Sequence, residues 1–186
     1  GIPTDRFGRV VEPDGDAHLI VPGLYAAGEC ACASVHGANR LGGNSLLDIL
    51  VFGRASGKQI IRYVQENPEH YPVDEESLGR ATARLARWNS KEEGISVAEL
   101  REEFQKVMED HAGVFRTEEI MTEGINKLLE LRKKLDRVVI SDHSDSFNTA
   151  RIEALELENM IDNGFAIACS ALARTESRGA HSRPDY

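Results

Sequence analysis

Short apolar runs near the start of the chain have the length and spacing of β-structure. Residues 19–21 and 24–27 are apolar, and Pro22-Gly23 separates the two runs. This pattern predicts a buried strand around a turn, and the strand is expected to end at Gly28. Because glycine has no side chain, a ligand could approach the backbone at that point.

A longer apolar stretch begins just after a pair of glycines. Residues 46–61 are rich in large apolar side chains, and Gly42-Gly43 precedes them. The stretch predicts a helix that is largely buried. We expect Gly43, or Gly42, to adopt a backbone conformation that other residues reach only at a cost in free energy.

The start of this helix has the features of a site for a negative charge. Asn44 or Ser45 could cap it, and Ser45 with Asp48 has the spacing of a capping box. The free N–H groups and the positive end of the helix dipole would favour an anion there. Arg40 precedes the helix and offers a planar guanidinium suited to a carboxylate. The sequence therefore predicts an anion or cofactor site between the strand and the helix.

From Asn67-Pro68 onward the pattern becomes helical, and we expect a domain boundary there, with residues 1–67 in one domain and 68–186 in the other. The first expected helix carries an apolar stripe, and three more begin at polar cap residues. The apolar stripe consists of Leu78, Ala81, Leu85 and Trp88. The three later helices are expected to begin at Ser96 with Glu99, at Thr117, and at Asn148 or Thr149. The short loops predict a bundle, with the last helix at its centre because it is apolar on more than one side.

Composition narrows the class of protein. The chain has 22 basic and 31 acidic residues, a net charge of -9, which argues against a surface for nucleic acid or anionic lipid. It has no apolar run as long as the roughly 18 residues of a membrane span, and no signal peptide opens it. Three cysteines indicate reduced thiols in the cytoplasm. Cys30 and Cys32 are expected to be small buried residues beside the strand, and no metal site is expected.

Two polar clusters in the second half have simple structural interpretations. Residues 141–145, Ser-Asp-His-Ser-Asp, precede a helix start and are typical of a polar turn rather than a metal loop. Four basic residues near the C-terminus could lie at a helix end closed by Gly179, where the dipole favours positive charge. They are Arg174, Arg178, His181 and Arg183.

Two motifs resemble a known flavoprotein family. The run His-Gly-Ala-Asn-Arg-Leu-Gly-Gly-Asn-Ser-Leu-Leu-Asp at residues 36–48, with Gly28-Glu29 before it, is similar to the succinate dehydrogenase, fumarate reductase and L-aspartate oxidase flavoproteins. Residues 174–181 resemble the C-terminal helical domain of the same family. The resemblance implies an α+β chain, in which the C-terminal part of an FAD-binding α/β domain is followed by an all-α helical bundle. The glycine pair with residues 46–48 favours the succinate dehydrogenase branch.

The resemblance also implies roles for individual residues. Arg40 would hold a substrate carboxylate beside the flavin, and Glu29 would bind flavin hydroxyls. Ser45 and Leu46 would offer their backbone N–H groups to the N1 and O2 edge of the flavin, where the helix dipole stabilises the reduced form. His36 and Asn44 are further candidates. From the residues alone, Arg40 could equally form a structural ion pair, Glu29 could be an ordinary strand-end acid, and His36 could serve a turn or packing.

The family further implies an oxidoreductase that moves a hydride from succinate to FAD and gives fumarate. Its partners would be an iron-sulfur subunit and membrane anchor subunits, which would hold it in the cytoplasm, peripheral to the inner membrane. For the basic cluster at residues 174–183, the resemblance implies a second interpretation, in which the C-terminal tail folds back onto the flavin domain.

The chain has no Gly-x-Gly-x-x-Gly after an opening strand, which is the turn that binds a dinucleotide pyrophosphate. We therefore expect an excised C-terminal portion that is inactive alone, binds FAD weakly or not at all, and self-associates through exposed apolar surface. The alternatives are a helical docking module formed by residues 74–173, or a fragment of fumarate reductase or L-aspartate oxidase.

Overall fold

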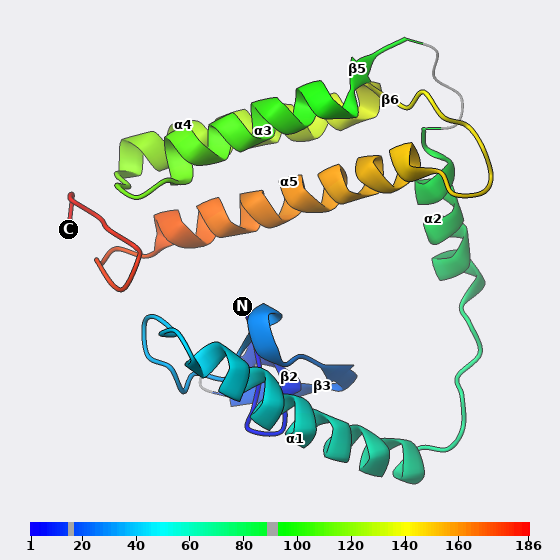
Figure 1. The fold of residues 1–186 in the computed structure, drawn as a ribbon, viewed down its shortest axis with the longest axis vertical. Helices are drawn as coiled ribbons and strands as arrows, with labels where there is room; N and C mark the ends of the chain where they lie inside the picture. Colours follow the sequence, from blue (N-terminus) through cyan, green and yellow to red (C-terminus); the bar gives the residue numbers. More distant parts are fainter. Residues whose placement is uncertain (15–16, 89–92) are drawn as a thin grey trace. The chain divides into compact units, whose positions relative to one another are not determined.

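The computed structural model describes residues 1–14, 17–88 and 93–186, which form two compact units, Gly1–Pro72 and Val73–Tyr186 (Figure 1). The first unit combines short strands with one long helix, and the second is almost entirely helical. The predicted class is confirmed: part of an α/β domain is followed by a helical region. The predicted boundary after residue 67 stays a prediction.

The first unit contains two small pairs of strands. β1 (Ile2–Pro3) runs parallel to β4 (Ala31–Cys32), and β2 (Arg9–Asp14) runs antiparallel to β3 (Ala17–Tyr25). The register between β2 and β3 shifts opposite Pro22-Gly23, where Gly23 has a φ of 77°. β3 is thus one continuous strand with an irregularity, and the expected turn between two runs was wrong. The side chains of Leu19 and Leu24 are exposed, so the expected burial was wrong as well.

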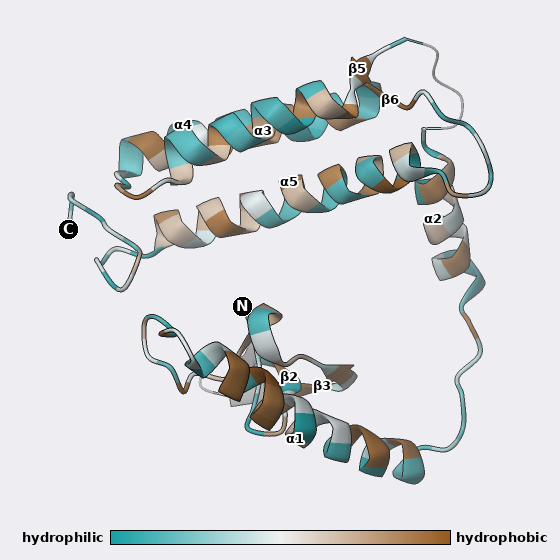
Figure 2. Ribbon diagram, viewed as in Figure 1, coloured by the Kyte–Doolittle hydropathy of each residue, from teal (hydrophilic) through white to brown (hydrophobic). Residues whose placement is uncertain are grey.

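Helix α1 (Asn44–Glu66) covers the strands with its polar side. Asp48 and Ser56 are its buried residues, whereas most of its large apolar side chains are exposed. Figure 2 shows this surface as brown segments along α1. Ser56 packs against Gly8, which leaves no room for a Cβ there. The expectation of a largely buried helix was therefore wrong, because the described part of this unit covers only one narrow face of the helix. No helix in the described residues is both long and apolar enough to cross a membrane.

The second unit is built on three helices that pack on one another, α3 (Val97–Ala112), α4 (Glu118–Lys134) and α5 (Thr149–Ala173) (Figure 1). Helix α2 (Glu75–Ala86) precedes them, and η2 (Leu135–Arg137) follows α4. A short parallel pair, β5 (Ile95–Ser96) with β6 (Val138–Val139), ties the start of α3 to the end of α4. Their core is apolar, and its fully buried members include Trp88, Leu100, Leu128, Leu157 and Ile161.

The helix starts in this unit follow their local signals. Ser96 and Glu99 form the predicted capping box, Thr117 caps α4, and Asn148 caps α5 by accepting the backbone N–H of Arg151. The buried residues of α5 lie on one stripe and Ile167 is exposed, so the expected central position of α5 was wrong. At Gly164 the helix comes so close to α3 that a Cβ would lie 2.6 Å from the Phe104 ring.

The connection before α5 is the polar turn that the sequence predicts. Ser144 N–H donates to Asp142 Oδ1 at 2.8 Å, and the Asn148 amide donates to the carbonyl oxygens of both residues. Asx-type hydrogen bonds of this kind are ordinary turn chemistry.

The C-terminal segment closes the end of α5 with a buried arginine. Arg183 donates from Nη1 to the carbonyl oxygens of Leu172 and Arg174, and from Nε and Nη2 to Asp185 at 2.8 Å. Helix α5 ends at Ala173, and Gly179, with a φ of 60°, lies in a turn between Arg178 and His181. The helix end is therefore closed by Arg183 and not by Gly179 as expected, because a guanidinium can satisfy several helix-end carbonyls at once.

Candidate functional site

The end of β3 and the start of α1 position the residues predicted for the site. After β3 the chain passes Gly28, which has a φ of 78°, and forms the 3-10 helix η1 (Gly28–Cys30) that carries Glu29. Helix α1 packs closely on η1, since a Cβ at Gly28 would lie 2.6 Å from Ile49 Cγ2. The glycine therefore permits the close approach that holds Glu29 beside the start of α1.

Arg40, in the loop before α1, faces two carboxylates. Its Nη2 lies 2.9 Å from Glu29 Oε2, and its Nη1 lies 3.7 Å from Asp48 Oδ1. The Arg40 side chain is 18% exposed, that of Glu29 is 88% exposed and that of Asp48 is 6% exposed. The first contact has the length of a charge-assisted hydrogen bond, and the second is a longer ion pair. Within the chain, Arg40 thus forms ion pairs, which is one of the two interpretations that the residues alone allowed.

His36 joins the same cluster through Asp48. Its Nε2 donates to Asp48 Oδ2 at 2.7 Å, and its side chain is largely shielded from solvent. Sequence reasoning placed His36 among the candidates but assigned Asp48 only to a capping box. One signal could have identified Asp48, because it is the single charged residue in the apolar run 46–52.

The first turn of α1 has no side-chain cap. Gly43 occupies the N-cap position with a φ of 84°, and Asn44 is the first helical residue. The expected caps at Asn44 or Ser45, and the capping box of Ser45 with Asp48, were therefore wrong, because Ser45 lies inside the helix and Asp48 turns towards His36. The expected costly conformation at Gly43 is confirmed.

The first-turn residues Asn44, Ser45 and Leu46 lie at the open end of the helix, and Ser45 is half-buried. A Cβ built at Gly43 would meet nothing within 4 Å, so the backbone is uncovered on that side of the residue. A helix end that has no side-chain cap and lies beside an arginine favours a bound anion.

The two cysteines near the site are exposed, which corrects the expectation that they are buried. Hydrogen bonds from the backbone and side chain of Ser34 hold the pKa of the Cys32 thiol below its ordinary value. Among the residues that the structure describes, no group of three or more His, Cys, Asp and Glu side chains could hold a metal ion.

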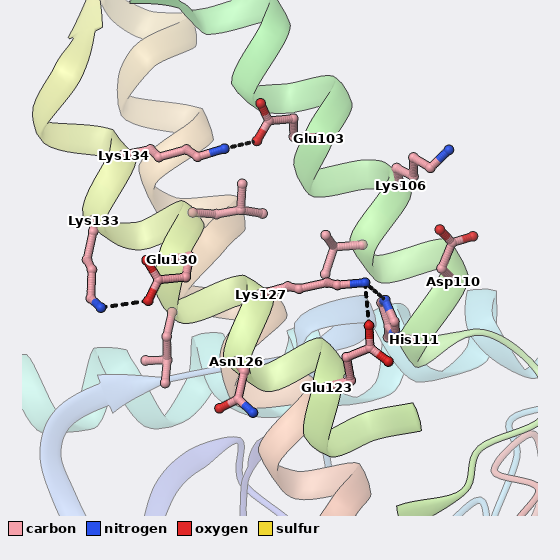
Figure 3. Close-up of a pocket in the computed structure, with 13 residues that line it drawn as sticks. Glu103, Lys106, Asp110, His111, Glu123, Asn126, Lys127, Glu130, Lys133 and Lys134 are labelled. Carbon is pink, nitrogen blue, oxygen red and sulfur yellow. Dashed lines mark hydrogen bonds and ion pairs between the residues drawn. The ribbon is translucent and has the colours of Figure 1, made fainter. Parts of the chain in front are cut away.

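The second unit has a hollow of its own between α3 and α4, with a volume of about 730 Å³ (Figure 3). Several of its charged side chains pair with each other: Lys127 Nζ contacts Glu123 at 2.7 Å and His111 Nε2 at 2.9 Å, and Lys133 contacts Glu130 at 2.6 Å. None of the predicted site residues lines it. These paired charges are typical of a solvated helix surface.

Comparisons with known proteins agree along the whole chain. Residues 1–46 match a family described as FAD binding domain, and residues 101–186 match one described as Fumarate reductase flavoprotein C-term. The succinate dehydrogenase flavoprotein subunit of Coxiella burnetii is 48% identical over 187 residues, covering 100% of this chain. The chain belongs to the succinate dehydrogenase and fumarate reductase flavoprotein family. It spans 32% of the length of the Coxiella protein.

Solved structures of this family share the fold. A Mycobacterium smegmatis Sdh1 complex in the apo form matches with a TM-score of 0.84 and 39% identity, over 96% of this chain and 30% of the matched one. E. coli quinol fumarate reductase matches with a TM-score of 0.85 and 36% identity, over 98% of this chain and 30% of that one. The family thus includes relatives named for either direction of the succinate and fumarate reaction.

Proposed function

We propose that residues 29–48 form one wall of the flavin and dicarboxylate site of an FAD-dependent oxidoreductase that converts succinate to fumarate. The observation that carries this proposal is the placement of Arg40, a mostly shielded guanidinium held beside the uncapped N-terminus of α1. Two kinds of positive group, the guanidinium and the uncapped end of the helix, thus lie close together in the chain. Such a pair suits ligands that carry carboxylates and a reduced flavin.

The residues present fit one edge of FAD. The Glu29 carboxylate is almost fully exposed and can accept hydroxyl hydrogen bonds, and the N–H groups of Ser45 and Leu46 have no side-chain cap to displace. A Cβ at Gly43 would meet no atom within 4 Å, so a ligand could approach the backbone there. His36 and Asn44 would flank it. When bound, FAD supplies the hydride acceptor, and the helix dipole favours the negative charge of its reduced form.

In this proposal Arg40 binds one carboxylate of succinate with both prongs of its guanidinium. Bidentate binding fixes the orientation of the dicarboxylate, so that its carbon–hydrogen bonds stay at a defined place relative to the flavin. The succinate dehydrogenase direction is supported by the 48% identity to the Coxiella protein, against 40% to the fumarate reductase flavoprotein subunit of a Serratia strain.

The proposal extends to partners, which we assign by the same relationship. We propose that an iron-sulfur subunit takes the electrons, and that membrane anchor subunits hold the complex on the cytoplasmic side of the inner membrane. The matched M. smegmatis structure is a complex, which supports a multi-subunit assembly. Residues 1–67 would then belong to the FAD-binding domain and residues 68–186 to the helical C-terminal domain.

Arg40→Lys in the complete protein tests this function. Lysine keeps the charge but loses the two-pronged geometry, so succinate turnover should fall by roughly a hundredfold or more. FAD content should stay close to that of the wild type, because Arg40 is assigned to the substrate. Wild-type steady-state kinetics in Arg40→Lys, with full FAD content, would remove the assignment.

The rival function is a helical docking module in which residues 74–173 bind a partner and the first unit is a scaffold. Flavin absorption distinguishes the two: the complete protein should show flavin bands that bleach on addition of succinate. The chain of residues 1–186 alone should bind FAD weakly and oxidise no succinate, since the sequence has no pyrophosphate turn. A complete protein without flavin bands would favour the docking module.

A further inference from the structure

Asp48 stands out among the residues of α1 because it is a buried carboxylate on a helix whose apolar side chains are mostly exposed. Its side chain is 6% exposed, whereas Leu47 and Leu50 on either side of it are well exposed. Burying an ionised carboxylate costs free energy unless partners compensate it. Its partners are therefore a structural requirement of this site and not an incidental surface contact.

Both partners come from the loop that precedes α1. Asp48 Oδ2 accepts the hydrogen bond from His36 Nε2 at 2.7 Å, while Oδ1 faces Arg40 Nη1 at 3.7 Å. Each oxygen thus serves one partner. The short bond to His36 fixes the orientation of the carboxylate, and the charge on the other oxygen attracts the guanidinium.

The two carboxylates around Arg40 differ in how easily a ligand could replace them. Glu29 is 88% exposed, so its ion pair with Arg40 is screened by water and weak, and water can solvate the carboxylate once it is displaced. Displacing Asp48 would leave a buried charge without compensation, which costs far more. An incoming carboxylate can therefore exchange with Glu29 but not with Asp48.

We propose that Asp48, held by His36, is the positioning residue of Arg40, and that a substrate carboxylate takes the place of Glu29 on the guanidinium while Asp48 stays. The exchange leaves Glu29 free for a hydroxyl-bearing ligand such as the flavin side chain. This inference rests on the proposed function, because it assumes that Arg40 binds the dicarboxylate.

The test is the binding of malonate to the complete FAD-loaded protein, followed by the change in flavin absorption. Malonate carries two carboxylates but has a single carbon between them, so it cannot form the carbon–carbon double bond and measures binding alone. Asp48→Asn should raise the malonate Kd by about tenfold or more, as loss of a close charge pair does. Asp48→Glu, which restores the charge, should stay within about threefold of the wild type.

Coupling to Arg40 separates positioning from a general structural role. In an Arg40→Lys background, Asp48→Asn should raise Kd by no more than about twofold, since the group it positions is already lost. Glu66→Gln, which removes the other carboxylate of α1, is the matched control and should leave Kd unchanged.

Each contrary result has a distinct meaning. A wild-type malonate Kd in Asp48→Asn would overturn the positioning role while leaving Arg40 as the substrate residue. The same holds if the increases in Kd caused by Asp48→Asn and Arg40→Lys multiply when the two substitutions are combined. A wild-type Kd in Arg40→Lys would overturn the proposed function itself. If Asp48→Asn fails to retain FAD, His36→Asn decides: it should raise Kd several-fold by itself and add nothing to Arg40→Lys. An unchanged Kd in His36→Asn would then overturn the inference.

Discussion

The two units of this chain treat their apolar residues in opposite ways. In the second unit α3, α4 and α5 bury their apolar stripes against one another around Leu157. In the first unit α1 buries Asp48 and Ser56 and exposes its leucines. An apolar pattern thus shows which residues favour burial, but the surrounding chain determines whether they are buried. The polar cluster of the candidate site lies in the less covered unit.

The contrast between the two units should be greatest for a buried leucine and an exposed one. Leu157 is 0% exposed in α5 and Leu50 is 68% exposed in α1. Leu157→Ala should lower the free energy of unfolding of the second unit by about 2–5 kcal/mol, because it leaves a cavity. Trp88 is the only tryptophan and is fully buried in this core, so its fluorescence in a urea titration measures the loss.

The matched change Leu50→Ala should alter stability by no more than about 0.5 kcal/mol, measured by hydrogen exchange of the α1 amides. It should also reduce self-association of the chain, because it removes exposed apolar surface. Comparable losses in Leu50→Ala and Leu157→Ala would contradict the contrast between the two units.

A smaller effect is expected at the glycine pair before α1. Gly43 has a φ of 84°, so Gly43→Val should cost about 1–2 kcal/mol of local stability and reduce FAD retention in the complete protein. Gly42 does not have a positive φ of this kind and has open space around it, so Gly42→Val is the control. Equal FAD content in the two variants would show that the backbone conformation at Gly43 does not matter to the site.

Helix starts provide the next contrast. Ser96 caps α3 in a complete capping box, whereas Ser45 makes no capping hydrogen bond in α1. Ser96→Ala should therefore lower stability by about 1 kcal/mol, and Ser45→Ala by less than about 0.5 kcal/mol. Urea midpoints for Ser96→Ala and α1 hydrogen exchange for Ser45→Ala give the two values. A larger loss at Ser45 would mean that α1 depends on a side-chain cap after all.

The smallest effect is a pH dependence confined to the second unit. The hydrogen bond from Arg183 and the backbone N–H of Glu118 hold the pKa of Asp185 far below its usual value of 3.8. Because the folded state favours the ionised carboxylate, this stabilisation is complete above about pH 4. It is lost as the pH falls from there through the lowered pKa.

Asp185→Asn should reduce the loss of stability of the second unit at acid pH. The stability is measured as urea midpoints by Trp88 fluorescence between about pH 2 and 6. Hydrogen exchange of α1 in the first unit should not respond to the substitution. If Asp185→Asn loses as much stability at acid pH as the wild type, the pH dependence arises from other carboxylates.

What the sequence predicted correctly was mostly local. The starts of α3, α4 and α5 depend on Ser96, Thr117 and Asn148, each of which bonds to a backbone N–H three residues later. Contacts of this range are visible in a sequence because neighbouring residues alone determine them. Local chemistry indicated Arg40, the family resemblance added a role for Glu29, and the structure brings these two residues together.

What the sequence missed depends on partners farther along the chain. Asp48 was read as part of a capping box, but its partner His36 lies twelve residues away across a loop. Arg183 is buried because the C-terminal segment also bonds to the connection between α3 and α4, through Arg116 and His181, which are 65 residues apart. No local pattern specifies such pairings, because loop geometry and packing determine them together.

The tight approach at Gly164 has a consequence for how this fold can vary. A side chain larger than hydrogen at that position would collide with Phe104 and Met108, so the two helices cannot change independently there. A relative with alanine at the position of Gly164 should carry a smaller residue at the position of Phe104, or a wider spacing between these helices. Residues 104 and 164 are therefore expected to covary among relatives, although they lie on different helices and far apart in the sequence.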